Sequence, residues 1–282
     1  MAKDWSAWVG GQQIAHDRAD IGAATRWRAM LDSEGAIGAA VPQSFHWGLC
    51  LPDAPTAQLG LDGHPHRGGF LPPVDLPRRM WASSAVTFLA PIPVGSAVKR
   101  TSTIASVTQK SGGTGQLVFV EVDHSLTADG QTAVQERQTI VYREAASAPM
   151  PASAPPKEDL DLSAWPWQRS LTPTEPLLFR FSALTFNSHR IHYDLPYARE
   201  QELYPGLVVQ GPLTASLLID LCSRHLGDQP LASFSFRGVS PAFCSEAMHL
   251  LGRQEGHAIN LCALGADGRT VMSATATTKE AP

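Results

Sequence analysis

The segment 187–194, NSHRIHYD, brings together side chains that can move protons, bind a metal or cap a turn. Its polar members are Asn187, His189, His192 and Asp194. Imidazole changes its charge near neutral pH, which makes histidine a common general acid or base and a common metal ligand. The sequence on either side of the segment therefore has to indicate which of these uses applies.

A buried helix with an open start is expected soon after this segment. Gly211 permits close approach of a ligand to the backbone, and Pro212 suits the first helical position because it has no N–H to leave unpaired. The residues that follow, through Leu226, are apolar almost all round, which is typical of a buried helix. Such a helix start can bind an oxyanion, and Gln210, directly before it, is expected to shape the pocket.

Metal binding is an alternative use of the histidines. His189 and His192 are three residues apart and could share a helix face, but zinc needs a third ligand at a recognisable spacing, and none is evident. His64 and His66 form an H-x-H pair in a loop rich in Gly and Pro, which is a weak indication of a metal site. We therefore expect no metal.

Nucleophilic catalysis and a structural role are further alternatives. The chain has no G-x-S-x-G motif, and no cysteine lies close to His189 or His192 in sequence. Asn187 and Asp194 could both cap turns, and for Asp194 we favour a cap on a short helix over 195–202. For His192 we favour chemistry, because it lies in the same short stretch as the oxyanion-type helix start.

Composition limits the function classes. The chain has 282 residues, 43% hydrophobic content, a net charge of −4 and a pI near 6.2, with no basic stripe for nucleic acid. Four scattered cysteines are typical of a reducing compartment. No signal peptide is visible, and no stretch approaches the roughly 18 apolar residues of a membrane span. We expect a cytoplasmic protein that binds neither nucleic acid nor membrane.

Two sets of strands flank a Pro/Ala/Ser-rich linker. We expect a helix over 20–33, an aromatic stretch at 42–51, a long irregular loop at 53–77 and the central helix at 212–226. Alternating Val, Ile, Thr and Phe residues predict strands. These strands are expected at 81–89, 96–108, 116–126, 132–142, 231–237, 246–254, 257–264 and 270–278. The expected domains are 1–144 and 177–282, joined by a linker at 145–176.

An internal repeat supports two copies of one unit. SAVTFLAPIP from Ser84 aligns with ASFSFRGVSP from Ala232, and TADGQTAV from Thr127 aligns with GADGRTVM from Gly265. Each copy is expected to be a helix followed by about four antiparallel strands, and a helix that is apolar all round has to be wrapped by its sheet. The predicted class is α+β, a double hotdog fold.

At these residues the chain resembles a known family. The stretches FSALTFNSHRIHYD and YPGLVVQGPL resemble the signature of the MaoC-like, or R-specific, enoyl-thioester hydratases. The segment HRGGFLPPVDLPRRMWASSAVTF resembles the degenerate first half of their two-hotdog members. The resemblance covers nearly the whole chain and is closest to the itaconyl-CoA and 3-methylfumaryl-CoA hydratases, which make citramalyl-CoA. It implies one active site per chain, where the halves meet.

The resemblance also implies roles for the central residues. In the family motif Asp-x-Asn-x-x-His, this chain has Asn187, His189 and His192 at the three named places. The usual Asp and His hold one water between them, but an amide cannot take a proton at neutral pH. Asn187 is therefore expected to orient the water, His192 to be the base unless another carboxylate enters, and the Gly211 N–H to hold the thioester oxygen.

The implied activity is hydration of a branched unsaturated dicarboxylic acyl-CoA. No cofactor is expected, with CoA serving only as the carrier, and a homodimer is the expected assembly. A 3-hydroxyacyl-thioester dehydratase of fatty-acid synthesis and a non-catalytic acyl-thioester binding protein are the alternatives. The expected substrate-binding residues are Arg190, His189 and Gln210, and Arg180 and Arg199 are further candidates for the CoA phosphates or for a free carboxylate.

Overall fold

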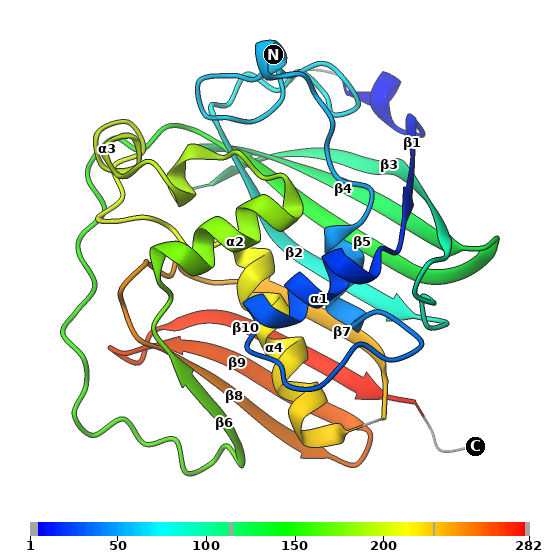
Figure 1. The fold of residues 1–282 in the computed structure, drawn as a ribbon. Coiled ribbons are helices and arrows are strands. Elements are labelled where there is room, and N and C mark those ends of the chain that lie inside the picture. The colour runs from blue at the N-terminus through cyan, green and yellow to red at the C-terminus, as the bar shows by residue number, and fades with distance from the viewer. Residues whose placement is uncertain (1–4, 113–114, 228, 280–282) are drawn as a thin grey trace.

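A single ten-stranded antiparallel sheet forms the framework of the protein (Figure 1). The computed structural model describes residues 5–112, 115–227 and 229–279. The strand order is β1-β3-β4-β5-β2-β7-β10-β9-β8-β6. The strands are β1 (Gln12–Arg18), β2 (Arg78–Phe88), β3 (Ala97–Gly112), β4 (Gly115–Ala128), β5 (Gln131–Arg143), β6 (Trp167–Leu171), β7 (Leu231–Gly238), β8 (Met248–Glu255), β9 (Ala258–Gly265) and β10 (Thr270–Thr278). Eight of these elements coincide with predicted strands; β1 and β6 were not predicted.

The sheet is two copies of one five-stranded unit joined edge to edge. The order reads the same from both ends when β1 to β5 are matched with β6 to β10. The join is an antiparallel pairing of β2 with β7, in which Val86 faces Phe234. These two residues are also 148 apart, the offset of the repeated segments that begin at Ser84 and Ala232, so the pseudo-twofold axis passes through this pair. The double hotdog expected from the repeat is confirmed.

The helices α1, α2 and α4 lie on one side of the sheet, and α3 lies beyond its edge (Figure 1). They are α1 (Ile21–Met30), α2 (Glu175–Thr185), α3 (Leu195–Glu200) and α4 (Gly211–Leu226), with short 3-10 turns η1 (Ser6–Trp8), η2 (Gln43–Gly48), η3 (Thr56–Gln58) and η4 (Arg190–His192). The side chains of α4 are buried from Leu213 through Cys222, as its continuous apolar sequence predicts. Within the described residues, every helix is too short or too polar to cross a membrane.

The first unit lacks a full central helix, which differs from the expectation of one wrapped helix per unit. Isolated bridges join Ala40 to Pro93 and Val208 to Phe243, at matching places in the two units. After Val208 the chain builds the 16 residues of α4, whereas after Ala40 it builds only η2. The sequence after η2, LCLPDAP, has two prolines that cannot sit inside a helix. The predicted helix at 20–33 is α1, which follows β1 as α2 follows β6 and packs on α2.

The segment expected to be a linker is partly structured. Strand β6 and the start of α2 both lie inside 145–176, so the second unit begins earlier than the predicted residue 177. β6 was missed because its five residues, WQRSL, are too few and too polar to show alternation. Before it, the chain runs along the second unit through hydrogen bonds such as Met150 N–H to the Leu203 carbonyl.

Candidate active site

The loop that follows α2 carries the ionisable residues. The helix ends at Phe186, which adopts the left-handed conformation at φ 49°. Asn187 then donates its N–H to the Ser182 carbonyl, and its side-chain oxygen accepts the N–H of His189 at 3.0 Å. Asn187 therefore caps the turn, and one acceptor position of its oxygen is used in doing so. The expected water-orienting role of this residue has to compete with this backbone bond.

His192 is fixed with one nitrogen free for chemistry. Its ring is buried, and Nδ1 lies 2.7 Å from the Val208 carbonyl oxygen. A carbonyl only accepts, so Nδ1 carries the proton and Nε2 has a lone pair. Burial lowers the pKa of His192 to about 4, although the bond to Val208 opposes this and a positive charge on His64 would lower it further. At neutral pH the ring is therefore a neutral imidazole that can accept a proton.

The same bond brings His192 to the start of α4. Val208 also donates its N–H to the Ile191 carbonyl, and three residues later Gly211 begins the helix. No hydrogen bond joins the Gly211 N–H to another described residue, and Pro212 has no N–H. A Cβ built on Gly211 would meet only the Trp81 carbonyl oxygen, at 3.9 Å. The open helix start therefore lies between the His192 loop and strand β2 of the first unit.

Gln210 is held in the core by bonds from its amide nitrogen to α2, which leave that nitrogen unavailable to a substrate; its expected role in shaping the pocket stays a prediction. Its side chain is 1% exposed. The amide nitrogen donates to the Leu178 carbonyl at 3.0 Å and to the Ser182 hydroxyl at 2.9 Å, both on α2. A buried amide needs such partners, and these bonds tie α2 to the start of α4.

Arg190 was expected to bind the substrate through the CoA phosphates or a free carboxylate, but its guanidinium is bonded to other residues of the chain. Its guanidinium forms a two-point ion pair with Asp194 at 2.7 and 3.0 Å and donates to the Leu61 carbonyl. Asp194 in turn caps α3 by accepting the N–H of Tyr197, as the sequence suggests. The fork that could hold a carboxylate of the substrate is thus occupied. Of the other two arginines, Arg180 is exposed, and Arg199 is exposed and donates to a backbone carbonyl.

A loop from the first unit completes the site. It folds back through a bridge between Leu59 and Pro65 and docks on the segment after α2. The Arg190 N–H donates to the Asp62 carbonyl at 2.9 Å, and the Ser188 hydroxyl donates to the Gly63 carbonyl at 2.5 Å. The predicted irregular loop at 53–77 is therefore ordered where it meets the second unit.

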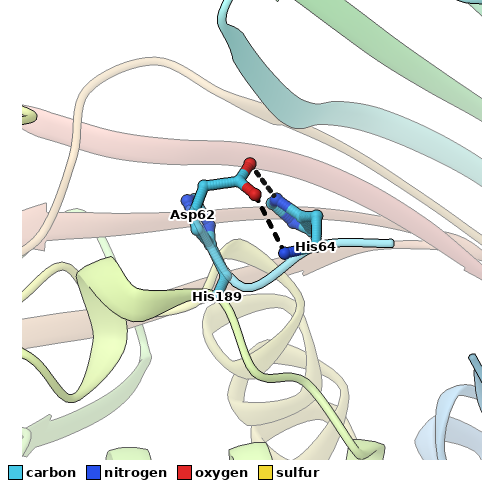
Figure 2. A group of neighbouring side chains, drawn as sticks. All are labelled: Asp62, His64 and His189. Atoms are coloured by element: carbon cyan, nitrogen blue, oxygen red, sulfur yellow. Dashed lines mark hydrogen bonds and ion pairs between the residues drawn. The ribbon is translucent and has the colours of Figure 1, made fainter. Parts of the chain in front are cut away.

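This loop adds a carboxylate and an imidazole to the histidines of the second unit (Figure 2). Asp62 Oδ2 lies 2.9 Å from His64 Nδ1, and Oδ1 accepts the His64 N–H at 3.0 Å. The His64 ring packs on the His189 ring with centroids 4.1 Å apart. His189 meets His192 edge-on at 5.3 Å. One carboxylate and three imidazoles therefore form a row of successive contacts across the boundary between the units, in the order Asp62, His64, His189 and His192.

The charges of this cluster follow from its burial and its partners. Burial raises the pKa of the Asp62 carboxyl, but hydrogen bonds and charge from His64 outweigh this and hold it below its usual range. Burial lowers the pKa of His64, while the bond to Asp62 opposes that change. Burial, with the neighbouring imidazoles, lowers the pKa of His189 to about 2. At neutral pH the cluster holds one anionic carboxylate and neutral rings.

Asp62, His64 and His189 are also the group best placed to hold a metal. One ligand atom from each lies within 4.8 Å of the others. The Asp62–His64 contact is, however, a direct hydrogen bond that uses Nδ1 of His64. Asp62 and His64 are thus paired by hydrogen bonds without an ion, and His189 meets the pair through ring packing.

Sequence reasoning missed Asp62 and His64 as members of the site. The signal was present, since a long loop in a compact domain is usually functional and D-x-H lies in its Gly-rich turn. The contact with residues 187–190 spans more than 120 residues of chain, and only the fold reveals it. His189 contacts His192, and His192 is bonded to Val208, three residues before α4 begins at Gly211; their shared catalytic role stays a prediction.

Two five-stranded antiparallel units joined edge to edge, with one long central helix, define a double hotdog fold. A family model for hydroxyacyl-thioester dehydratase type 2 matches residues 44–244, so the chain belongs to this family. A mesaconyl-C(4)-CoA hydratase of Chloroflexus aurantiacus is 44% identical over 96% of this chain and 97% of that protein.

Solved structures agree on the fold. A MaoC-like dehydratase of Phytophthora capsici superposes with a TM-score of 0.70 at 11% identity, over 97% of each chain. A Mycobacterium tuberculosis protein described as having a double hotdog fold gives a TM-score of 0.58 at 10% identity, over 96% of each chain. At these identities the agreement concerns the fold alone.

The docking of the loop can be tested at Gly63. This residue has φ +86°, and a Cβ there would lie 1.9 Å from the Ser188 carbonyl oxygen. We expect Gly63→Ala to displace the loop and reduce activity at least tenfold while the core still unfolds cooperatively. Gly68→Ala is the matched control, because Gly68 has φ +89° and a Cβ would meet nothing closer than 3.6 Å. Equal activity of the two variants would contradict the docking.

Proposed function

We propose that this chain adds water across the double bond of a branched unsaturated dicarboxylic acyl-CoA, such as 3-methylfumaryl-CoA or itaconyl-CoA, to give citramalyl-CoA. The observation that carries the proposal is the placement of neutral His192 beside the open start of α4. The relative that matches over nearly its full length is named for mesaconyl-C(4)-CoA, and mesaconyl is the methylfumaryl group. CoA serves as carrier, and the reaction uses no further cofactor.

The chemistry needs one base and one oxyanion site. Nε2 of His192 takes a proton from water, and the resulting hydroxide bonds to the β-carbon. In 3-methylfumaryl-CoA the double bond is conjugated with the thioester, so its electron pair moves towards the thioester oxygen, where the Gly211 N–H stabilises the enolate charge. The His192 imidazolium then returns its proton to the α-carbon. One water is consumed, and the histidine regains its starting state.

Arg79 is the residue we assign to the free carboxylate of such a substrate. It lies on β2, two residues before Trp81, whose carbonyl faces Gly211. It is half-buried, and its positive charge lowers the pKa of both His64 and His189, which places it near the cluster. Among the described residues it forms no ion pair. Its neighbour Arg78, in contrast, is paired with Glu202 at 2.6 Å.

Substrate preference separates the candidate functions. We expect hydration of 3-methylfumaryl-CoA or itaconyl-CoA to exceed that of crotonyl-CoA, which lacks the second carboxylate, by at least tenfold in kcat/KM. A preference for crotonyl-CoA and 3-hydroxyacyl thioesters would favour the dehydratase of fatty-acid synthesis. Binding of all these thioesters without turnover would identify a non-catalytic protein. Enoyl-thioester absorbance, which is lost on hydration of a conjugated substrate and gained on dehydration, measures turnover, and calorimetric titration measures binding.

The base can be tested at His192 and Asn187. Replacing His192 with Ala should reduce the rate by about 10²–10⁴, the usual worth of general acid–base catalysis. Asn187→Asp restores the common family motif and places a negative charge near His192, which should raise its pKa. The neutral ring is the base, so activity is lost as the pH falls below the pKa of His192. With that pKa raised, the acidic limb of the activity profile of the variant should lie at a higher pH than in the wild type. Near-normal turnover of His192→Ala, or an unshifted profile for Asn187→Asp, would contradict the assignment.

The carboxylate site can be tested at Arg79. Arg79→Gln should raise KM for 3-methylfumaryl-CoA by about tenfold to a hundredfold, the effect of losing roughly 1.5–3 kcal/mol from a charged hydrogen bond. The KM for crotonyl-CoA should change little. Arg199→Gln is the control, because Arg199 is an exposed arginine on α3. Equal losses with both substrates would show that Arg79 acts on the fold or on CoA.

A further inference from the structure

In the proposed hydration, the attacking water has one assigned partner, His192. In the common arrangement a carboxylate and a histidine hold it, but here the carboxylate is replaced by Asn187. The Asn187 oxygen already accepts the His189 N–H at 3.0 Å. One of the two lone pairs of that oxygen is therefore used, and another residue near His192 can supply a further acceptor for the water.

His64 offers an acceptor with the required lone pair. Asp62 is an anion that can only accept, so the His64 Nδ1 bonded to it carries the proton. Nε2 of His64 then has the free lone pair, which is the same tautomer that the Val208 carbonyl imposes on His192. The two rings thus present identical acceptor nitrogens, one from each half of the chain.

The position of His64 is fixed by the fold. Its loop is held on residues 187–190 by the hydrogen bonds at Asp62 and Gly63. His64 packs on His189, which contacts His192, and a charge on His64 would change the pKa of His192. Burial, together with the charges of Arg79 and Arg67, lowers the pKa of His64 against the influence of Asp62.

We propose that the Asp62–His64 pair replaces the missing family carboxylate, with Nε2 of His64 accepting one hydrogen of the water that His192 deprotonates. His64 is then a catalytic residue that touches the reacting water, and Asp62 is a positioning residue that sets its tautomer. The inference rests on the proposed hydration. It makes the active site composite, because the first unit supplies half of the water site.

Asp62→Asn tests the tautomer directly. The amide has the same shape and can keep the loop in place, but it can donate to Nδ1 and so move the ring proton to Nε2. We expect kcat to fall by at least about 10², as for His64→Ala, with a cooperative unfolding transition like that of the wild type. The loop offers matched controls in the exposed residues Asp53 and His66, whose replacement by Asn and Gln should leave kcat unchanged.

The alternatives give different results. An Asp62→Asn variant with wild-type kcat would show that Asp62 is only structural and would overturn the proposal. Loss of wild-type activity on chelation, restored by zinc or another divalent cation, would also overturn it in favour of a metal held by Asp62, His64 and His189. A wild type inactive on all three thioesters would overturn the proposed function itself, whereas normal His64→Ala kinetics in an active background would remove only this proposal.

Discussion

The antiparallel pairing of β2 with β7 is the interaction on which the rest of the molecule depends. It joins two five-stranded sheets into one and sets the pseudo-twofold axis at Val86 and Phe234. Because both units then lie in one sheet, the loop of the first unit reaches the residues after α2. The same pairing places β2 against the start of α4, where Trp81 faces Gly211. Neither unit alone contains all the groups that lie around His192.

The shortened helix of the first unit has its own effect on the interior. η2 places His46 and Trp47 beside Glu136, a buried residue of β5. Glu136 accepts hydrogen bonds from Trp47 at 3.2 Å and from Ser84 at 2.5 Å, and His46 lies 3.6 Å away. Burial raises the pKa of Glu136, but His46, His124 and Ser84 outweigh this and lower it to about 2. A buried charge with these partners is tolerated because the polar groups around it are themselves fixed.

Much of the fold could be predicted from the sequence, and the site only in part. The repeat and the alternation of Val, Ile and Thr gave eight strands, and the apolar run after Pro212 gave α4, because both signals are local. β6 and the loss of the first central helix were not predicted, since a short polar edge strand has no periodicity and a 3-10 turn replaces a helix without a distinct pattern. His192 and Gly211 were assigned from their spacing and from the family resemblance, and their roles stay predictions. Asp62 was not, because its partners at 188–190 are neighbours only in the folded chain.

The reduced central helix also limits how the duplicated chain can change over time. A duplication at first provides a spare copy, in which one half can vary while the other keeps the activity. Here the first unit has no long helix whose start could form an oxyanion site. Its chain continues from η2 into the loop that carries Gly63. Single substitutions cannot rebuild a 16-residue helix across Pro52 and Pro55. The two halves have thus become mutually dependent, and variation at residue 63 is tied to the backbone at residue 188 in the other half.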